Sequence, residues 1–217
     1  MNSFAIPRRA NPIATLRRMA KRQQRASAVE QCEFCSQPLS PGHRHLLEMA
    51  TRKIVCACDP CAMRFENVIG RWKLIPRDAK SLPDFRITDA QWNALALPIN
   101  LAFLFHSTPE NKAVAMYPSP AGAMQSLLPL SSWEAMVAEN AVLAGMQPDV
   151  EALLVNRLES AGEYYIAPID VCFELSGVIR VNWRGLSGGE KVWSEISSFF
   201  GRLKSTGAPR EMEVAHA

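Results

Sequence analysis

The feature of this sequence that most constrains its fold is a group of cysteines near the N-terminus. Two Cys-x-x-Cys pairs, Cys32 with Cys35 and Cys58 with Cys61, are separated by 22 residues. Such a pair directs two thiolates toward one ion, and the distance between the pairs is close to that in zinc ribbons. We therefore predict a metal site formed by these four thiolates.

A fifth cysteine, Cys56, lies two residues before Cys58. On a β-strand both side chains would face the same side, so Cys56 is an alternative ligand that could replace Cys58. His43 and His45 would share one face of the opposite strand and could contribute a nitrogen. For the two histidines we favour an exposed strand start with no ligand role.

The ion is less constrained than the ligands. Four thiolates suit Zn(II), which is our first choice, and they also suit iron as a single ion or in a cluster. A module of about 30 residues cannot build a sufficient core alone, so a structural zinc would supply folding free energy. Iron would instead permit electron transfer. We therefore predict zinc, with iron as the alternative.

The composition excludes some classes of protein. With 48% hydrophobic and 21% charged residues, the chain is neither disordered in bulk nor a membrane protein. No apolar run approaches the roughly 20 residues of a spanning helix, and the N-terminus lacks the apolar stretch of a secretory signal. We expect a cytoplasmic location, where thiols stay reduced and can bind metal.

The chain divides into four segments. They are a basic arm at residues 1–28, which we expect to be flexible, a cysteine module at 29–80, a larger body at 81–204 and a disordered tail at 205–217. In the module, two short apolar runs around residues 50–52 predict a hairpin between the cysteine pairs. Residues 77–84, which contain or adjoin two prolines, predict a linker.

The body is predicted to contain two strand pairs, each followed by a helix. Residues 100–105 and 113–117 predict one hairpin, and residues 151–158 and 164–169 predict another. If they share a sheet, four antiparallel strands result, with helices on one face. The predicted fold class is therefore α+β: a small zinc-ribbon or rubredoxin-like module followed by this sheet. The sixth cysteine, Cys172, is predicted to be a buried core thiol.

The basic arm supports an alternative function. Residues 1–27 carry seven Lys and Arg residues and no acid, so the rest of the chain has a net charge of −4, because the total is +3. A basic arm beside a zinc ribbon is compatible with a nucleic-acid-binding regulator. The acidic body and the scarcity of aromatic residues in the arm make nucleic acid the less favoured partner.

One pattern resembles a catalytic motif. Gly185–Gly189 has the form Gly-x-Ser-x-Gly, as in the nucleophile elbow of α/β hydrolases. In that fold an acid and a histidine follow on further strands, whereas here only one helix and the tail remain. We interpret Ser187 as a helix cap, with Glu190 completing a capping box. The sequence therefore offers no catalytic residue, and we expect a protein that is not an enzyme.

Several motifs together carry a family resemblance. They are Cys-Glu-Phe-Cys at 32–35, His-Arg-His-Leu-Leu at 43–47, the cysteines at 56, 58 and 61, Tyr-Pro-Ser-Pro-Ala-Gly at 117–122, Val-Glu-Ala-Leu-Leu-Val-Asn-Arg at 150–157 and Trp-Arg-Gly-Leu-Ser-Gly-Gly at 183–189. They are similar to those of an uncharacterised bacterial family whose genes lie beside those of NiFe hydrogenases, especially high-affinity uptake types.

The similarity spans about residues 32–203 and leaves the arm and the tail outside. It implies a role in hydrogenase assembly, maturation or electron relay, with hydrogenase subunits or assembly factors as protein partners. It assigns no catalytic residue. Together with the cysteine pairs, the resemblance leads us to expect a non-catalytic metal-binding accessory protein.

Overall fold

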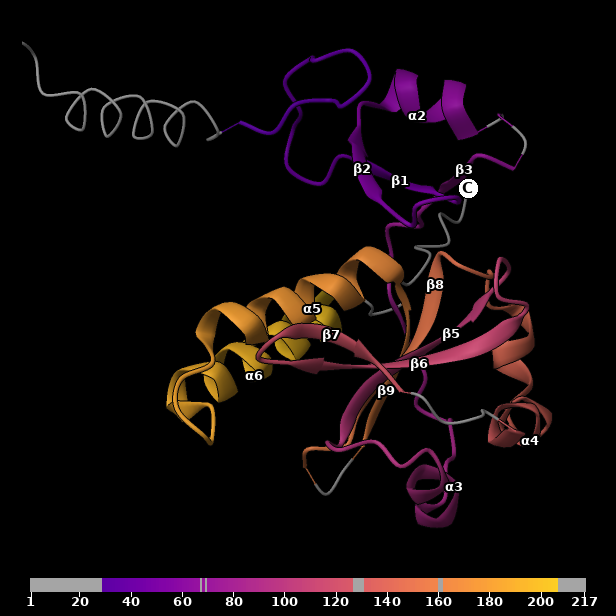
Figure 1. The fold of residues 1–217 in the computed structure, drawn as a ribbon, viewed down its shortest axis with the longest axis vertical. Coiled ribbons are helices and arrows are strands. Elements are labelled where there is room, and N and C mark those ends of the chain that lie inside the picture. Colours follow the sequence, from indigo (N-terminus) through magenta and orange to yellow (C-terminus); the bar gives the residue numbers. More distant parts are fainter. Residues whose placement is uncertain (1–28, 67, 69, 127–130, 160–161, 207–217) are drawn as a thin grey trace, which may run out of the picture.

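The chain folds into two antiparallel sheets with helices. The computed structural model describes residues 29–66, 68, 70–126, 131–159 and 162–206. A three-stranded sheet lies in the N-terminal part, and a six-stranded sheet forms the centre of the rest (Figure 1). The predicted flexible arm at 1–28 and most of the predicted disordered tail lie outside the described residues.

The smaller sheet has the strand order β2-β1-β3. Its elements are β1 (Arg44–Glu48), β2 (Ile54–Ala57), β3 (Trp72–Leu74) and the helix α2 (Asp59–Glu66). The hairpin expected between the cysteine pairs is confirmed, with His45 opposite Cys56.

The second cysteine pair lies at the start of α2. Asp59 and Pro60 occupy the first turn of this helix. A proline needs no N–H partner there, and an acidic side chain interacts favourably with the positive end of the helix dipole.

The predicted linker at residues 77–84 is part of the larger sheet. It contains the short strand β4 (Lys80–Ser81), which pairs with β9 (Glu163–Pro168). Ala79 and Leu82, on either side of β4, are both buried. The linker prediction was therefore wrong, since the prolines that favour a loop enclose a segment anchored by apolar side chains.

The larger sheet has the order β4-β9-β8-β5-β6-β7. Its other strands are β5 (Leu101–Ser107), β6 (Lys112–Ser119), β7 (Gly122–Gln125) and β8 (Glu151–Asn156). The two predicted hairpins are confirmed as β5 with β6 and β8 with β9, and they share a sheet through the pairing of β5 with β8. The sheet has six strands instead of the expected four, because β4 and β7 extend its edges.

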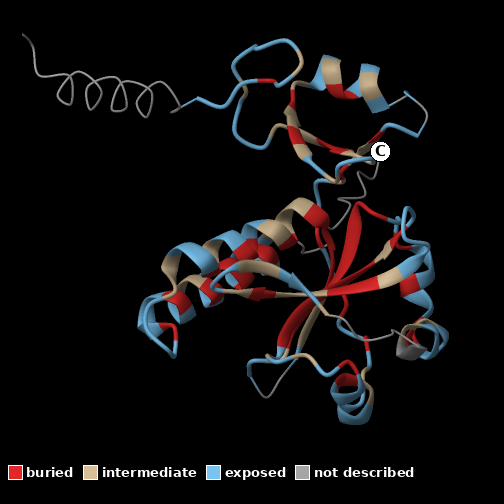
Figure 2. Ribbon diagram, viewed as in Figure 1, coloured by how far each residue is buried: buried red, intermediate tan, exposed pale blue. Residues whose placement is uncertain are grey.

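Helices cover both faces of this sheet, so the prediction of helices on one face was wrong. The helical elements are α3 (Asp89–Ala94), α4 (Ser131–Glu139), the 3-10 helix η1 (Ala141–Gly145), α5 (Ile169–Asn182) and α6 (Gly189–Thr206). Leu154 of β8 packs with residues of α5 and α6, whereas its neighbour Leu153 packs with residues of α3, α4 and η1. Every residue of β8 is buried (Figure 2). Its four central residues, 152–155, are all apolar. An apolar run without alternation is typical of a strand that is buried on both faces.

The last helix, α6, extends over 18 residues and packs one apolar face on the sheet. Val192, Ile196, Phe199 and Leu203 are buried, as their helical spacing predicts. The helix continues to Thr206, so the first two residues of the predicted tail are helical. No helix in the described part of the chain is long and apolar enough to cross a bilayer.

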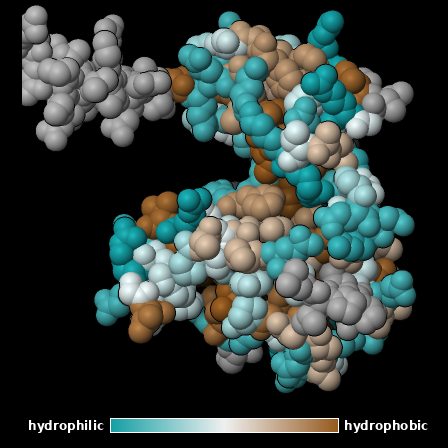
Figure 3. Space-filling view, viewed as in Figure 1, coloured by the Kyte–Doolittle hydropathy of each residue, from teal (hydrophilic) through white to brown (hydrophobic). Residues whose placement is uncertain are grey.

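The smaller sheet contacts the body through apolar and charged side chains. Leu47 of β1 and Ile75 are buried in the same cluster as residues of β5, β8 and α5. Apolar side chains are visible at the neck between the two parts (Figure 3). This junction attaches the smaller sheet, which contains the cysteine pairs, to the larger sheet.

Candidate metal centre

The structure brings the sulfurs of Cys32, Cys35, Cys58 and Cys61 within 4.8 Å of one another. The sulfurs of Cys35 and Cys58 are 3.7 Å apart. A tetrahedral zinc site with Zn–S bonds of about 2.3 Å has sulfur–sulfur edges of roughly 3.8 Å. The four cysteines could therefore hold one metal ion.

The first pair lies in a tight loop. The Cys32 amide donates to the Gln37 carbonyl at 2.8 Å, and the Ser36 amide donates to the Cys32 carbonyl at 2.8 Å. Ser36 closes the turn in the left-handed region, with φ of 62°. These bonds direct both side chains of the pair to the same side of the loop.

The second pair, Cys58 and Cys61, lies at the start of α2. Cys58 directly precedes the helix, and its carbonyl accepts a hydrogen bond from the Ala62 amide at 2.9 Å. Cys61 lies in the first turn of α2, where the backbone amides have no partner within the helix. The helix thus holds both thiols at its positive end.

The protonation of the four thiols depends on their mutual contacts. Burial raises the pKa of Cys32, but hydrogen bonds from the backbone of Cys58 and Phe34 outweigh it and lower that pKa to about 6. Burial, followed by hydrogen bonds with the other three thiols, raises the pKa of Cys61 to about 12. The protein alone thus favours the thiolate of Cys32 and the thiol of Cys61, and a bound cation would favour the thiolate form of Cys61 as well.

A small apolar cluster packs against three of the four cysteines, Cys32, Cys58 and Cys61. Its buried members are Cys32, Leu46, Val55, Ala57, Ala62 and Trp72. The ring of Phe34, inside the first cysteine pair, stacks on Phe65 of α2 with centroids 4.2 Å apart. The two segments that contain the cysteine pairs are therefore also joined by side-chain packing.

Cys56 lies outside the four-sulfur group. Strand β2 ends at Ala57, so Cys58 is no longer on the strand and the same-face argument does not apply to it. Cys56 instead faces the two histidines: one ligand atom each of His43, His45 and Cys56 lies within 4.8 Å of the others. The sequence contains the His-x-His pattern that could have indicated this group.

The expectation that the two histidines are exposed was wrong. Only 7% of the His43 side chain and 28% of the His45 side chain is exposed. The Nδ1 atom of His45 is 2.6 Å from a carboxylate oxygen of Asp170, at the start of α5. This hydrogen bond raises the pKa of His45, although burial opposes it. The contact of Asp170 with the N-terminal sheet was not predicted from the sequence.

The loop that contains Ser187 is a glycine turn at the entrance to α6. Gly185, Gly188 and Gly189 all have positive φ, and the Arg184 amide donates to the Gly188 carbonyl at 3.0 Å. The Ser187 carbonyl accepts a hydrogen bond from Trp193 at 3.2 Å. Backbone geometry thus accounts for the glycines of the Gly-x-Ser-x-Gly pattern.

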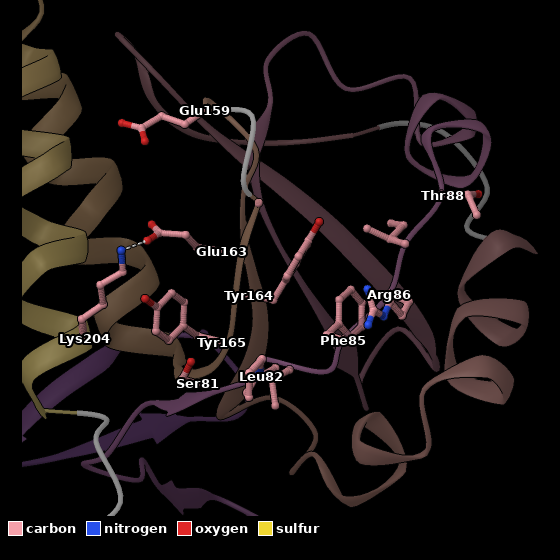
Figure 4. A pocket seen from close by; sticks show the side chains of 13 residues that line it. Ser81, Leu82, Phe85, Arg86, Thr88, Glu159, Glu163, Tyr164, Tyr165 and Lys204 are labelled. Carbon is pink, nitrogen blue, oxygen red and sulfur yellow. Dashed lines mark ion pairs between the residues drawn. The ribbon is translucent and has the colours of Figure 1, made fainter.

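A separate hollow of about 690 Å³ lies between β4, β9 and α6. Tyr164, Tyr165 and Phe85 line it, and Lys204 at its edge forms an ion pair with Glu163 (Figure 4). None of the described residues that line it is a cysteine or a histidine. The candidate metal ligands therefore lie elsewhere in the molecule.

Comparison with known proteins places the chain in a family. Searches of curated proteins and of solved structures gave no significant match. A family model described as "Family of unknown function (DUF5947)" matches residues 31–207, which include both cysteine pairs and the whole six-stranded sheet. This match confirms the expected resemblance to an uncharacterised family. The description of the family does not mention hydrogenases. The chain belongs to the family of unknown function DUF5947.

Proposed function

We propose that this protein is a metal-binding accessory protein in which Cys32, Cys35, Cys58 and Cys61 hold one ion. The observation that carries the proposal is the convergence of four sulfurs within 4.8 Å from a loop and a helix start. Four thiolates complete a tetrahedral site and leave no open position for a substrate. The proposed role is therefore structural or electron-transferring, and non-catalytic.

We propose Zn(II) as the ion, with iron as the alternative. A closed four-thiolate site of this kind supplies folding free energy to a small module. The same ligands hold iron in electron carriers, and the exposed position of Cys35 would bring such an ion close to solvent and to a redox partner.

Metal analysis of the full chain, purified without oxygen and without added metal, tests this proposal. We expect bound zinc in stoichiometric amount and no visible absorption, whereas iron bound by thiolates would be coloured. Cys58→Ser should lose this ion, and Cys172→Ala, a change of a buried core thiol, should keep it. Wild-type protein without a transition metal would refute the proposal.

We further propose that the partner is a hydrogenase subunit or a hydrogenase assembly factor. The support is the similarity of the cysteine, His-Arg-His and Trp-Arg-Gly-Leu-Ser-Gly-Gly motifs to a family encoded beside hydrogenase genes. Capture of partners with the tagged full chain from a nuclease-treated lysate of a hydrogen-oxidising host should recover these proteins. Normal hydrogenase activity in a deletion strain, together with no hydrogenase protein captured, would refute this role.

A further inference from the structure

A second group of metal-ligating side chains lies beside the four cysteines. The pairing of β1 with β2 places His45 directly opposite Cys56, and the His43 ring lies against the His45 ring with centroids 4.7 Å apart. One ligand atom from each of the three side chains lies within 4.8 Å of the others. Two imidazoles and one thiolate are ligands of the kind that Zn²⁺ and similar ions prefer.

Hydrogen bonds fix which nitrogen of each histidine is free. The Nδ1 atom of His43 is 3.1 Å from the Ser40 carbonyl oxygen. Nδ1 of His45 is 2.6 Å from the Asp170 carboxylate. Both oxygens are acceptors, so Nδ1 carries the proton and donates in each ring. Nε2 of each neutral ring is then left with a free lone pair, as in metal-binding histidines.

The Nε2 atom of His43 is buried and has no hydrogen-bond partner among the described residues. The side chain is only 7% exposed, so bulk water does not replace the missing partner. Buried polar atoms are nearly always paired in folded proteins. A cation bound at Nε2 would provide the missing partner.

We propose that His43, His45 and Cys56 bind a second divalent transition-metal ion such as Zn²⁺, separate from the ion held by the four cysteines. Three protein ligands leave the fourth position of a tetrahedral ion for water or another small ligand. Asp170 is a positioning residue, since its carboxylate holds the His45 ring in the metal-binding tautomer. The ion would thus be held by His43 just before β1, His45 of β1 and Cys56 of β2, and α5 would orient the ring of His45.

Anaerobic titration of the full chain with Co²⁺, followed by visible absorption, counts the ions. We expect two Co²⁺ per chain in wild type and one in both Cys56→Ser and His43→Gln. Cys58→Ser should keep the ion bound by the histidines and lose the other. His106→Gln, which changes a histidine on β5 outside the group, should still bind two ions.

The variants separate this proposal from that of the four-cysteine site. One ion that is lost in Cys56→Ser and kept in Cys58→Ser would support the second site and refute the first. One ion that is lost in Cys58→Ser and kept in both Cys56→Ser and His43→Gln would refute the second site. If circular dichroism shows that Cys56→Ser does not fold, the number of Co²⁺ ions bound by His43→Gln tests the second site instead.

The role of Asp170 has its own test. Asp170→Asn should lower the affinity for the second ion by about 10-fold to 100-fold, as is typical when the hydrogen-bond partner of a ligating histidine is removed. The affinity for the first ion should stay unchanged. Glu174→Gln, on an exposed part of α5, is the matched control and should change neither. Equal affinity of wild type and Asp170→Asn for the second Co²⁺ would refute the positioning role.

Discussion

The carboxylate of Asp149 is fully buried and lies 2.6 Å from the Nζ atom of Lys73. Lys73 belongs to β3 of the smaller sheet, whereas Asp149 precedes β8 of the larger one. The same carboxylate accepts hydrogen bonds from the amide of Thr108 at 2.9 Å and from its hydroxyl at 2.7 Å. Arg52, 3.4 Å away, adds a second positive charge from the smaller sheet. The junction between the two sheets thus contains a satisfied buried charge.

Asp149→Asn should therefore destabilise the protein. Loss of the charge weakens a buried, charge-assisted set of hydrogen bonds, and Lys73 is only about one-third exposed. We expect the free energy of unfolding at pH 7, measured with urea, to fall by about 2–3 kcal/mol. Glu110→Gln, which breaks the exposed ion pair with Lys112, is the control. It should change the free energy of unfolding by less than about 0.5 kcal/mol. Equal effects of the two variants would contradict the structural role of the junction.

The same residue predicts a dependence of stability on pH. Burial opposes ionisation of Asp149, but the hydrogen bonds from Lys73 and Thr108 outweigh it, so its pKa is lowered. Its contribution to stability is complete above the unfolded-state pKa of about 3.9 and is lost as the pH falls through the lower folded-state pKa. We expect the difference in unfolding free energy between wild type and Asp149→Asn to shrink below about pH 4. Both proteins contain the same thiolates, so the effect of acid on the thiolates cancels in the comparison. A difference in unfolding free energy that stays constant down to pH 2 would contradict the assignment of this pH dependence to Asp149.

Burial on both faces of the larger sheet can be tested with two adjacent residues. Leu153 and Leu154 are fully buried on opposite faces of β8. Each change to alanine should cost about 2–5 kcal/mol of unfolding free energy, because each leaves a cavity in a packed layer. Leu186→Ala, at a fully exposed position, should have little effect. A small effect of Leu153→Ala alone would mean that only one face is covered.

Local patterns predicted much of this fold. The four-cysteine group follows from chelating pairs that need only a loop, a hairpin and a turn between them. The hairpins of the larger sheet follow from apolar runs in the sequence. In each case the interactions that define the element lie close together in the sequence.

The missed features depend on contacts between distant residues. His45 and Asp170 are 125 positions apart, and nothing near either residue indicates the other. Strand β4 has only two residues, too few for an alternating pattern, and depends on its pairing with β9. The continuous apolar run of β8 did contain a signal for two covered faces, but a run alone does not show which helices cover them.

The glycine turn before α6 should tolerate no side chain at Gly188. Its φ is +85°, and an added Cβ would lie 2.7 Å from the side chain of the buried Val192. Gly188→Ala should therefore lower the unfolding free energy by about 1–3 kcal/mol. Gly201→Ala, inside α6 with open space around it, should instead raise it by about 0.5–1 kcal/mol. Thermal unfolding of both variants measures the contrast, and a neutral Gly188→Ala would show that the turn adopts another conformation.

Removal of metal should loosen the smaller sheet and leave the larger one intact. The apolar cluster around the cysteines has only six buried members, and one of them is Cys32 itself. Without a cation, the sulfurs no longer hold the first loop against α2, so the amides of β1 and β2 should exchange with solvent at least 10-fold faster, equivalent to about 1.4 kcal/mol of lost protection. Hydrogen exchange followed by mass spectrometry, with and without a chelator, should show this change in peptides that cover residues 44–57 and none in peptides that cover β8. Cys58→Ser should exchange quickly in this region even without chelator, and unchanged protection of residues 44–57 in the chelated wild type would mean that packing alone holds the module together.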